Sequence, residues 1–344
     1  MFSRLLFSAY LALSNAYNDT QCNVPLRTPP FRYLSKTQEV SSLRIAQYNA
    51  EWLFTHTYNG CPGSSCTWAN QSEANTHLQY VQSVLNDINP DIINFCEVEG
   101  CDELNQLSVD HPEYHSYLMF GTDTSTGQNV GLLSNQIPIS PIELSSNRVS
   151  YPIPGSKCGY TGSGGTEGVS KHYYTQFYIN DISIHMIGLH FLAYPTDITR
   201  CSQREAQAQV IQNIIVQLLK DDPIGEIIVL GDMNDFDGDI PDRNNNIPIS
   251  MVLDILKGNA GQYAGSYQLT NVAVLADQAE RYTDWWDSNN NCVSSMNEFS
   301  MIDHILVSTH LFDKIEKVEF YHQYSEYCGK YNSDHYPIIV DFVL

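Results

Sequence analysis

The sequence predicts an α/β sandwich built from mixed β-sheets, and two observations favour this fold class. Apolar patterns with the periods of strands and of helices alternate from Leu43 to the end of the chain. Hairpins are common among the expected strands, which favours mixed sheets over a purely parallel sheet. Hydrophobic residues make up 42% of the 344 residues and charged residues only 16%, so the chain can bury a substantial core.

The first expected elements are a strand, a helix and a second strand. The segment "LRIAQYNAEWLF", residues 43–54, predicts a strand that ends near Asn49. Apolar residues then recur at helical spacing up to Ile88, and Pro90 ends this helix. The segment "DIINFCEVE", residues 91–99, predicts the second strand because it is a short, continuous apolar run.

The later elements continue the alternation. Two strands, "HYYTQFYIN" and "DISIHMIGLHFLA", form an expected hairpin that turns at Asn180 and Asp181. The stretch 159–168 is rich in glycine and predicts a single loop. A helix is expected over 203–221, and further strands are expected at 129–134, 227–231, 300–308, 317–322 and 335–344.

The N-terminus has the pattern of a secretory signal peptide. Arg4 supplies a positive charge, an apolar stretch follows, and Ala16 stands at a small-residue cleavage site. The apolar stretch is shorter than the roughly 20 residues that a membrane span needs. We therefore expect a secreted, extracellular protein without membrane insertion. The expected organisation is a signal peptide at 1–16, an N-terminal extension at 17–42 and a single domain at 43–344.

Nine cysteines agree with export, because disulfides persist in oxidising compartments. The odd count leaves at least one thiol free or paired with another chain. Cys61 and Cys66 are expected to close a small loop. Cys96 and Cys101 could do the same, or Cys96 could belong to the core, since it lies within an apolar run.

The formal net charge of −22 comes from 39 acidic and 17 basic residues. Proteins held by nonspecific phosphate contacts usually carry a basic face, so this charge disfavours a nucleic-acid substrate. It does not exclude one, because charges beyond about 8 Å are screened at physiological salt. A divalent cation in the site could also invert the local field.

Polar residues follow or precede several expected strands at one of their ends. They are Asn49, Glu97, His190, Asp232, Asn234, Asp303, Asp334 and His335. Each alone is more often a turn former, a solvated acid or a hydrogen-bonded core histidine, and Asp235 is interpreted as solvated. Together they predict a pocket at converging strand ends.

Such a pocket needs a cation. Burying several unpaired carboxylates costs several kcal/mol each unless a positive charge compensates, and the basic residues are few and dispersed. A bound divalent metal ion is the simplest source of this positive charge. Carboxylate and amide oxygens suit Mg²⁺ or Mn²⁺. Asp232 and Asn234 are two residues apart, so on an extended chain their side chains point the same way.

The motifs "YNAEW", "CEVE", "GLH", "GDMN", "IDHIL" and "SDHYP" stand in this order along the chain. In this order the sequence resembles the endonuclease/exonuclease/phosphatase superfamily, which has the deoxyribonuclease I-like fold. The resemblance runs from about Leu43 to Leu344. It implies a four-layer α/β sandwich of two packed mixed β-sheets flanked by helices. It also implies cleavage of phosphate esters with a divalent cation.

The resemblance implies a role for each residue of the expected pocket. Asn49 and Glu97 look like metal-site residues, and Asp334 looks like a metal ligand or a partner of a histidine. The implied catalytic residues are the acid–base pair His190 and His335, the phosphate and nucleophile positioners Asp232 and Asn234, and the further carboxylate Asp303. Additional structural Ca²⁺ sites stay open.

Two positions depart from the family pattern. Related proteins often carry an acidic residue just before the glycine of "VGLL", where it can orient the histidine, but Gln128 and Asn129 stand here. What holds the tautomer of His190 is therefore open. Glu99 stands where nucleases of this fold have a basic residue that helps to grip DNA, which works against tight duplex binding.

Three function classes follow. An imidazole acid or base supplies about 10²–10⁴-fold, far less than phosphate-ester hydrolysis requires, so the metal and the acidic cluster must contribute. We expect first a secreted, monomeric, metal-dependent endonuclease that acts on nucleic-acid phosphodiesters. The alternative is a sphingomyelinase-like or other small phosphodiester hydrolase, favoured by the acidity but lacking an evident amphipathic membrane helix. The third class, a non-catalytic binding module, conflicts with the presence of both histidines and all the acidic positions.

Overall fold

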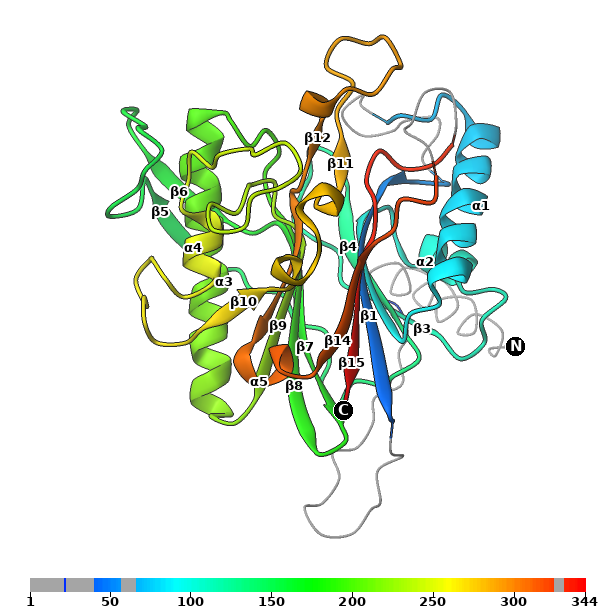
Figure 1. The fold of residues 1–344 in the computed structure, drawn as a ribbon, viewed down its shortest axis with the longest axis horizontal. Helices are drawn as coiled ribbons and strands as arrows, with labels where there is room; N and C mark the ends of the chain where they lie inside the picture. Colours follow the sequence, from blue (N-terminus) through cyan, green and yellow to red (C-terminus); the bar gives the residue numbers. More distant parts are fainter. Residues whose placement is uncertain (1–21, 23–39, 57–65, 325–330) are drawn as a thin grey trace, which may run out of the picture.

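The computed structural model describes residue 22 and the ranges 40–56, 66–324 and 331–344. The expected signal peptide and most of the expected extension lie outside these residues. Two β-sheets form the centre of the molecule (Figure 1). The six-stranded sheet has the order β14-β15-β1-β2-β4-β3, and the five-stranded sheet has the order β10-β13-β9-β8-β7.

The strands of the six-stranded sheet are β1 (Ser42–Leu53), β2 (Ile92–Val98), β3 (His115–Leu118), β4 (Asn129–Ser134), β14 (Ile315–Phe320) and β15 (Ile338–Val343). Those of the five-stranded sheet are β7 (Lys171–Ile179), β8 (Ile182–His190), β9 (Glu226–Asp232), β10 (Leu269–Asn271) and β13 (Asp303–Ser308). Two small sheets pair β5 (Arg148–Tyr151) with β6 (Gly165–Gly168), and β11 (Asp284–Trp285) with β12 (Phe299–Ser300).

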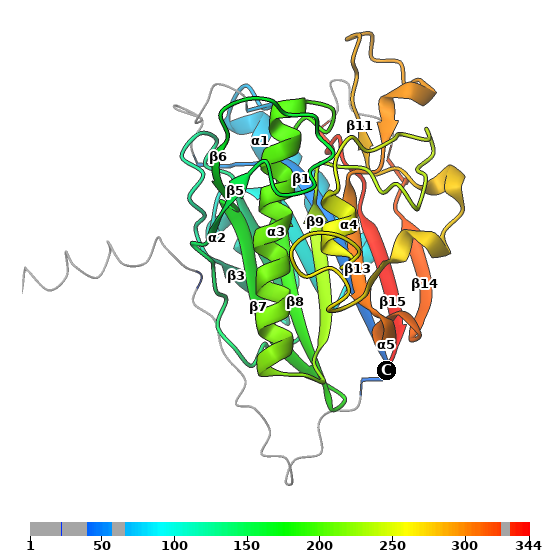
Figure 2. The same ribbon diagram turned by 90° about the vertical axis from the view of Figure 1, so that its left-hand side faces the viewer.

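Helices cover the outer faces of both large sheets. The α-helices are α1 (Gln71–Ile88), α2 (Cys101–Leu107), α3 (Ile198–Asp221), α4 (Val252–Leu256) and α5 (Thr309–Phe312), and short 3₁₀ helices span Val272–Leu275, Gln278–Glu280 and Met296–Glu298. Figure 1 shows α3 and α4 on one side and α1 and α2 on the other, and Figure 2 shows α3 lying across the five-stranded sheet. The predicted four-layer α/β sandwich is confirmed.

Alternation along the central strands builds the three apolar interfaces between these layers. In β9, Ile228 and Leu230 belong to the core between the two sheets, whereas Ile227 and Val229 pack with α3. In β1, Ile45 faces the core between the sheets, and its neighbour packs under α1. Because both faces of these strands are covered, they appear in the sequence as continuous apolar runs.

Both large sheets are mixed, as expected. β1 pairs parallel with β2, and β8 pairs parallel with β9, while the other strand pairs of these sheets are antiparallel. The expected hairpin is confirmed between β7 and β8. Its two turn residues have left-handed backbones, with φ of 47° at Asn180 and 63° at Asp181, as a tight hairpin turn requires.

Some boundaries differ from the expectation for identifiable reasons. The strand expected to end near Asn49 continues to Leu53, after a register shift against β2. Glu51 and Trp52 take left-handed φ values of 45° and 49° within this irregular segment. The stretch 159–168 is not a single loop, because β6 lies in it and pairs with β5. Helix α1 begins before the apolar pattern does, because the Asn70 side chain accepts hydrogen bonds from the first-turn N–H groups.

Two disulfides join described residues, Cys22–Cys101 and Cys158–Cys201. Cys96 is a free, buried thiol, so the alternative Cys96–Cys101 bridge is wrong and Cys96 belongs to the core. Cys66 is also disulfide-bonded, but Cys61, its expected partner, lies outside the described residues.

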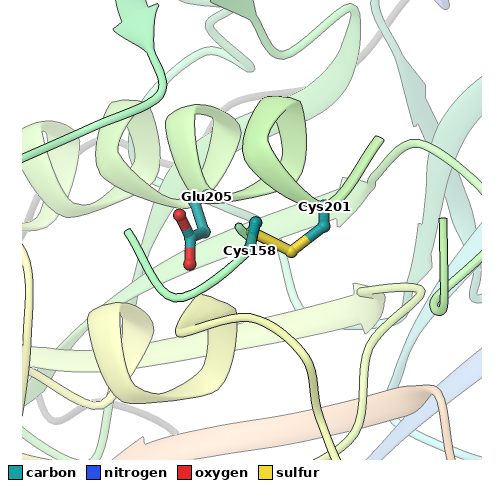
Figure 3. Close-up of side chains that lie close together, drawn as sticks. All are labelled: Cys158, Cys201 and Glu205. Atoms are coloured by element: carbon teal, nitrogen blue, oxygen red, sulfur yellow. A yellow bond between two sulfur atoms is a disulfide. The ribbon is translucent and has the colours of Figure 1, made fainter. Parts of the chain in front are cut away.

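The Cys158–Cys201 bridge lies beside the buried carboxylate of Glu205 (Figure 3). Glu205 Oε1 accepts hydrogen bonds from Met251 N at 2.9 Å and from Lys157 N at 3.4 Å. The disulfide and this carboxylate thus fasten the chain before β6 and the chain before α4 to the start of α3. Across the described ranges, no helix is long and apolar enough to cross a membrane.

Candidate active site

The fold brings one end of each central strand to a common edge. β1 and β2 run parallel, and so do β8 and β9, so the residues at their carboxyl ends lie together. β13 runs antiparallel to β9, and its first residue, Asp303, is paired with Asp232. Asp232 is paired on its other side with His190. The strand-end residues that the sequence singled out therefore meet in one place.

Asn49 links the two sheets at this edge. Its amide Nδ2 donates to Asp232 Oδ2 at 3.0 Å and lies 3.4 Å from Glu97 Oε1. The same nitrogen lies 3.4 Å from His335 Nε2. Its side-chain oxygen accepts a hydrogen bond from the backbone N–H of Glu51 at 3.1 Å. Asn49 therefore contacts an expected metal ligand, an expected phosphate positioner and an expected acid–base residue at once.

His335 is held by a carboxylate on the opposite sheet. Its Nδ1 lies 2.7 Å from Asp303 Oδ2, and Gln47 Nε2 donates to the other Asp303 oxygen at 2.9 Å. Burial opposes a charged imidazole, but the nearby Asp303 carboxylate outweighs it and raises the pKa of His335 well above its usual value. Asp334 Oδ1 lies 3.9 Å from His335 Nε2. Of the two aspartates, Asp303 is therefore the one hydrogen-bonded to this histidine.

His190 has no such partner. Its Nε2 lies 3.6 Å from Asp232 Oδ2 and 3.9 Å from Glu97 Oε1. Its Nδ1 is buried and has no hydrogen-bond partner among the described residues. Burial, and then the positive charges of Lys171 and His335, lower the pKa of His190 well below its usual value. Both effects favour the neutral imidazole.

The two amides at the departure from the family pattern do not orient His190. Gln128 Oε1 accepts a hydrogen bond from Lys171 Nζ at 3.1 Å. Asn129 Nδ2 donates to backbone oxygens, the nearest being that of Glu99 at 2.9 Å. Lys171 lies directly across from His190 in the β7–β8 ladder. A buried lysine and glutamine pair therefore occupies the neighbourhood in which related proteins often carry an acidic residue.

Asp232 and Asn234 adopt a turn and not the extended geometry expected from their spacing. Asn234 has a left-handed φ of 48°, and its backbone N–H donates to Asp232 Oδ1 at 2.9 Å. Its side-chain Nδ2 donates to the backbone oxygen of Phe191 at 3.3 Å. The turn leaves Asp232 Oδ2 directed at Asn49 and His190. One carboxylate oxygen therefore holds the turn, and the other faces the site.

Two carboxylates of the site were not singled out from the sequence. Glu51 Oε2 accepts from the backbone N–H of Asp334 at 3.0 Å, and Glu51 Oε1 accepts from Thr67 Oγ1 at 2.7 Å. Asp284 Oδ1 lies 3.8 Å from His335 Nε2. Glu51 stands in the motif "YNAEW", but only the irregular backbone after Asn49 turns it into the site. No sequence signal identifies Asp284.

The crowded carboxylates perturb one another. Burial and then neighbouring carboxylates raise the pKa of Asp334 to about 7, although His335 acts in the opposite sense. Burial raises the pKa of Asp284 to about 6. Burial, and then the charge of Asp334, raises the pKa of Glu51 well above its usual value. Burial, and then the charge of Asp303, also raises the pKa of Asp232.

The cluster also holds a buried oxygen that no described residue bonds, Asp334 Oδ1. This donor set fits a hard divalent cation, since oxygen atoms predominate and positive charge is scarce.

Asp235 is not the solvated residue that the sequence suggested. It is fully buried, and its Oδ2 accepts hydrogen bonds from Arg204 Nε at 3.1 Å and from Ser250 Oγ at 2.7 Å. Arg204 is itself fully buried. The arginine comes from α3 and also donates to backbone oxygens of the segment after β8. This ion pair supports the turn after Asp232 from beneath.

Glu99 is occupied within the chain. Its Oε2 accepts the backbone N–H groups of Thr55 and His56, both at 2.8 Å. It orders the segment that follows β1.

Comparisons with known proteins agree with this arrangement. The model of the endonuclease/exonuclease/phosphatase family matches residues 46–323. No curated protein matches the sequence significantly. The chain resembles a truncated TDP2 from Caenorhabditis elegans with a TM-score of 0.53 and 14% identity, over 88% of this chain and 98% of that one. It also resembles NExo, a 3′-5′ exonuclease from Neisseria meningitidis, with a TM-score of 0.55 and 16% identity, over 88% of this chain and all 100% of that one. At these identities the two structures show a shared fold.

Proposed function

The chain belongs to the endonuclease/exonuclease/phosphatase family, and on this premise we propose that it is a metal-dependent endonuclease that hydrolyses nucleic-acid phosphodiester bonds. One observation carries the proposal. The pair Asp303–His335 and the imidazole of His190 face one carboxylate cluster from different strands. Two relatives of the same fold support the choice of substrate: a NExo variant was solved with a product DNA hairpin and a D. rerio TDP2 with a single-strand DNA product.

The reaction needs an activated water, stabilisation of charge on the phosphate and a proton for the leaving oxygen. His335 is oriented through Nδ1 by Asp303, so its Nε2, which lies 3.4 Å from Asn49 Nδ2, faces the cluster and can exchange a proton with the reacting atoms. His190 Nε2 lies at the same cluster. One imidazole takes the proton of the attacking water, and the other gives a proton to the leaving oxygen. Asn49 and the turn at Asp232 hold the polar groups that receive the phosphate.

A divalent cation fits the same cluster. Glu97 and Asp334, joined by Glu51, offer carboxylate oxygen atoms in one crowded place. Asn49 would bind the cation through its Oδ1, which here accepts the backbone N–H of Glu51. When bound, Mg²⁺ or Mn²⁺ would neutralise these carboxylates and stabilise the negative charge that develops on the phosphate oxygens. The side chains of the protein still bind and orient the phosphate and transfer the protons.

The test offers the purified protein three substrates in parallel, with Mg²⁺ and with EDTA. Plasmid DNA and RNA should be cut internally with Mg²⁺ and left intact with EDTA, while sphingomyelin vesicles stay unchanged. The single variants His190→Ala and His335→Ala should each lose most of the activity. Activity that survives chelation, or both histidine variants near the wild-type rate, would contradict the mechanism.

A second candidate is a lipid or other small phosphodiester hydrolase. The net charge of −22 favours it, and so does Glu99, an acidic residue where nucleases of this fold have a basic one, because both weaken contacts to a phosphate backbone. Cleavage of only the sphingomyelin vesicles would select this candidate.

We also propose that the protein is exported and acts as a monomer. The Cys22–Cys101 and Cys158–Cys201 disulfides support export, because such bonds persist in oxidising compartments. Mass spectrometry of the exported protein should find Tyr17 at the N-terminus, and light scattering should give the mass of one chain. A retained Met1 in the mature protein would contradict the leader.

A further inference from the structure

A large aromatic side chain lies open to solvent close to the carboxylate cluster. Trp286 is 64% exposed, whereas its neighbour Trp285 is only 3% exposed. The segment between β11 and β12 projects beyond the ends of the large sheets (Figure 1). An isolated exposed apolar residue needs no explanation by itself, so the position of Trp286 relative to the site decides what it can do.

The strand β11 is anchored firmly to the site. Asp284 of β11 forms a β-bridge with His335. The backbone N–H of Trp285 donates to the oxygen of Asp334 at 3.0 Å, and that of Trp286 donates to the oxygen of Glu298 at 2.9 Å. These bonds place the backbone of Trp286 at a defined distance from the carboxylates. The backbone of Trp286 is therefore fixed relative to the site.

Alternation along this strand sets the direction of Trp286. Asp284 pairs with Ser300 and Trp285 with Phe299, and the hydrogen bond from Trp286 to Glu298 continues that pairing by one residue. Side chains two residues apart on a strand point to the same face. Trp286 therefore lies on the face of Asp284, whose carboxylate is 3.8 Å from His335 Nε2. The buried Trp285 points to the other face.

The charge of the protein limits how a nucleic acid could be held there. With 39 acidic and 17 basic residues, the chain gains little from the counterion release that dominates most DNA binding. Base stacking on an aromatic ring supplies affinity without positive charge, and it requires an unpaired base with an open face. A base in a duplex is already stacked on both sides.

We propose that Trp286 is a stacking platform for the nucleobase next to the scissile phosphate, and that the enzyme acts on unpaired strands in preference to duplexes. The inference rests on the proposed nuclease function and deepens it by naming the form of the substrate. Val293 and Met296 on the same projecting segment are also exposed, but the ring of Trp286 is the side chain that shares a strand face with the site.

The experiment compares Trp286→Ala, Trp286→Phe and the matched control Val293→Ala in the full chain. Val293 is 65% exposed on the same segment, so its truncation removes a similarly exposed apolar group. Three oligonucleotides of one length are cleaved: a single strand, its duplex, and a single strand with abasic tetrahydrofuran sites around the cut position. Circular dichroism confirms that each variant is folded.

For the wild type, kcat/KM should be higher on the single strand than on the duplex or the abasic strand. Trp286→Ala should lower kcat/KM on the single strand by about 5- to 100-fold, the range expected for loss of one stacked base. The ratio of the intact strand to the abasic strand should fall toward one. Trp286→Phe should restore most of the ratio, and Val293→Ala should match the wild type.

An unchanged ratio in Trp286→Ala would overturn the inference while leaving the nuclease function in place. Equal losses in Trp286→Ala and Val293→Ala, together with weaker binding of both to phosphatidylcholine vesicles, would also overturn it and assign the segment to a lipid surface. A wild-type protein that cleaves no oligonucleotide would overturn the proposed function itself.

Discussion

Asp303 Oδ2 lies 2.7 Å from His335 Nδ1, although the two residues come from β13 and from the segment just before β15, which belong to different sheets. Gln47 of β1 donates to the second Asp303 oxygen at 2.9 Å. The contact therefore crosses the interface between the two sheets and leaves His335 Nε2 directed at the site. A histidine held in this way has a defined orientation.

Replacing Asp303 should remove that orientation. We expect Asp303→Asn to lower kcat by about 10²–10⁴-fold, a loss similar to that of a general acid or base. Steady-state cleavage of a labelled oligonucleotide measures the effect. The control is His310→Ala, which removes an exposed histidine paired with Glu226. The control should retain the wild-type rate, and an equally active Asp303→Asn would show that the pair does not assist catalysis.

Divalent cations should stabilise the fold as well as support activity. Burial and mutual repulsion raise the pKa values of Glu51 and Asp334, the latter to about 7, so a bound cation relieves unfavourable charge in the folded state alone. Mg²⁺ in excess of its dissociation constant should raise the Tm measured by differential scanning fluorimetry. Glu97→Gln should reduce this shift, and an identical shift in both proteins would place the cation elsewhere.

Removing one partner of the buried Arg204–Asp235 ion pair should lower the free energy of unfolding strongly. Arg204 and Asp235 are both fully buried, so Arg204→Met leaves an uncompensated carboxylate. We expect a loss of about 3–5 kcal/mol in the free energy of unfolding, measured by urea denaturation. The double variant Arg204→Met/Asp235→Asn should recover part of it, because no buried charge remains.

A half-buried ion pair gives the comparison. Arg44 Nε lies 2.6 Å from Asp341 Oδ1 and Nη2 lies 3.0 Å from Oδ2, but the Arg44 side chain is 38% exposed. Arg44→Met should cost clearly less than Arg204→Met, about 1 kcal/mol, since water reaches and screens this pair. Similar losses in Arg44→Met and Arg204→Met would contradict the role assigned to burial.

His172 should contribute stability that is lost in mild acid. Its Nδ1 donates to the oxygen of Val169 at 2.8 Å, and its Nε2 accepts from the N–H of Ser145 at 3.0 Å. Both nitrogens are thus satisfied only in the neutral imidazole. Burial lowers the pKa of His172 to about 4 in the folded protein, against about 6.5 in the unfolded chain.

The sign follows from proton binding. Between pH 6.5 and pH 4 the unfolded chain binds this proton and the folded protein does not, so stability is present above pH 6.5 and is lost as the pH falls toward 4. The difference between the two pKa values corresponds to about 3 kcal/mol. Urea denaturation at several pH values measures the slope. His172→Gln should flatten this slope, and an unchanged slope would assign the acid sensitivity to other groups.

Local chemistry made much of the site predictable from the sequence. Apolar runs with polar residues at their ends predict that Asn49, Glu97, His190, Asp232 and Asp303 lie at one edge. This works because a strand buried on both faces has a simple pattern, and its carboxyl end lies beside those of its parallel neighbours. The order of the short motifs then narrows the fold to one family.

The partners of charged residues were not predictable in the same way. Asp235 follows the same turn as Asp232, yet it is buried against Arg204 from a helix. Glu51 enters the site only because the backbone after Asn49 is left-handed at two residues. Asp284 enters it only through a β-bridge to His335, far along the chain.

The sequence alone therefore determined the layers of this protein, the alternation of its strands and the kinds of ligand gathered at one edge. The tertiary structure alone decided which carboxylate holds His335, that no described residue bonds His190 Nδ1, and that Trp286 is exposed while Trp285 is buried. The physical reason is the distance along the chain between the residues that decide each property. Burial and alternation depend on neighbouring residues along the chain, whereas the protonation and orientation of a buried polar group depend on contacts between residues that only folding brings together.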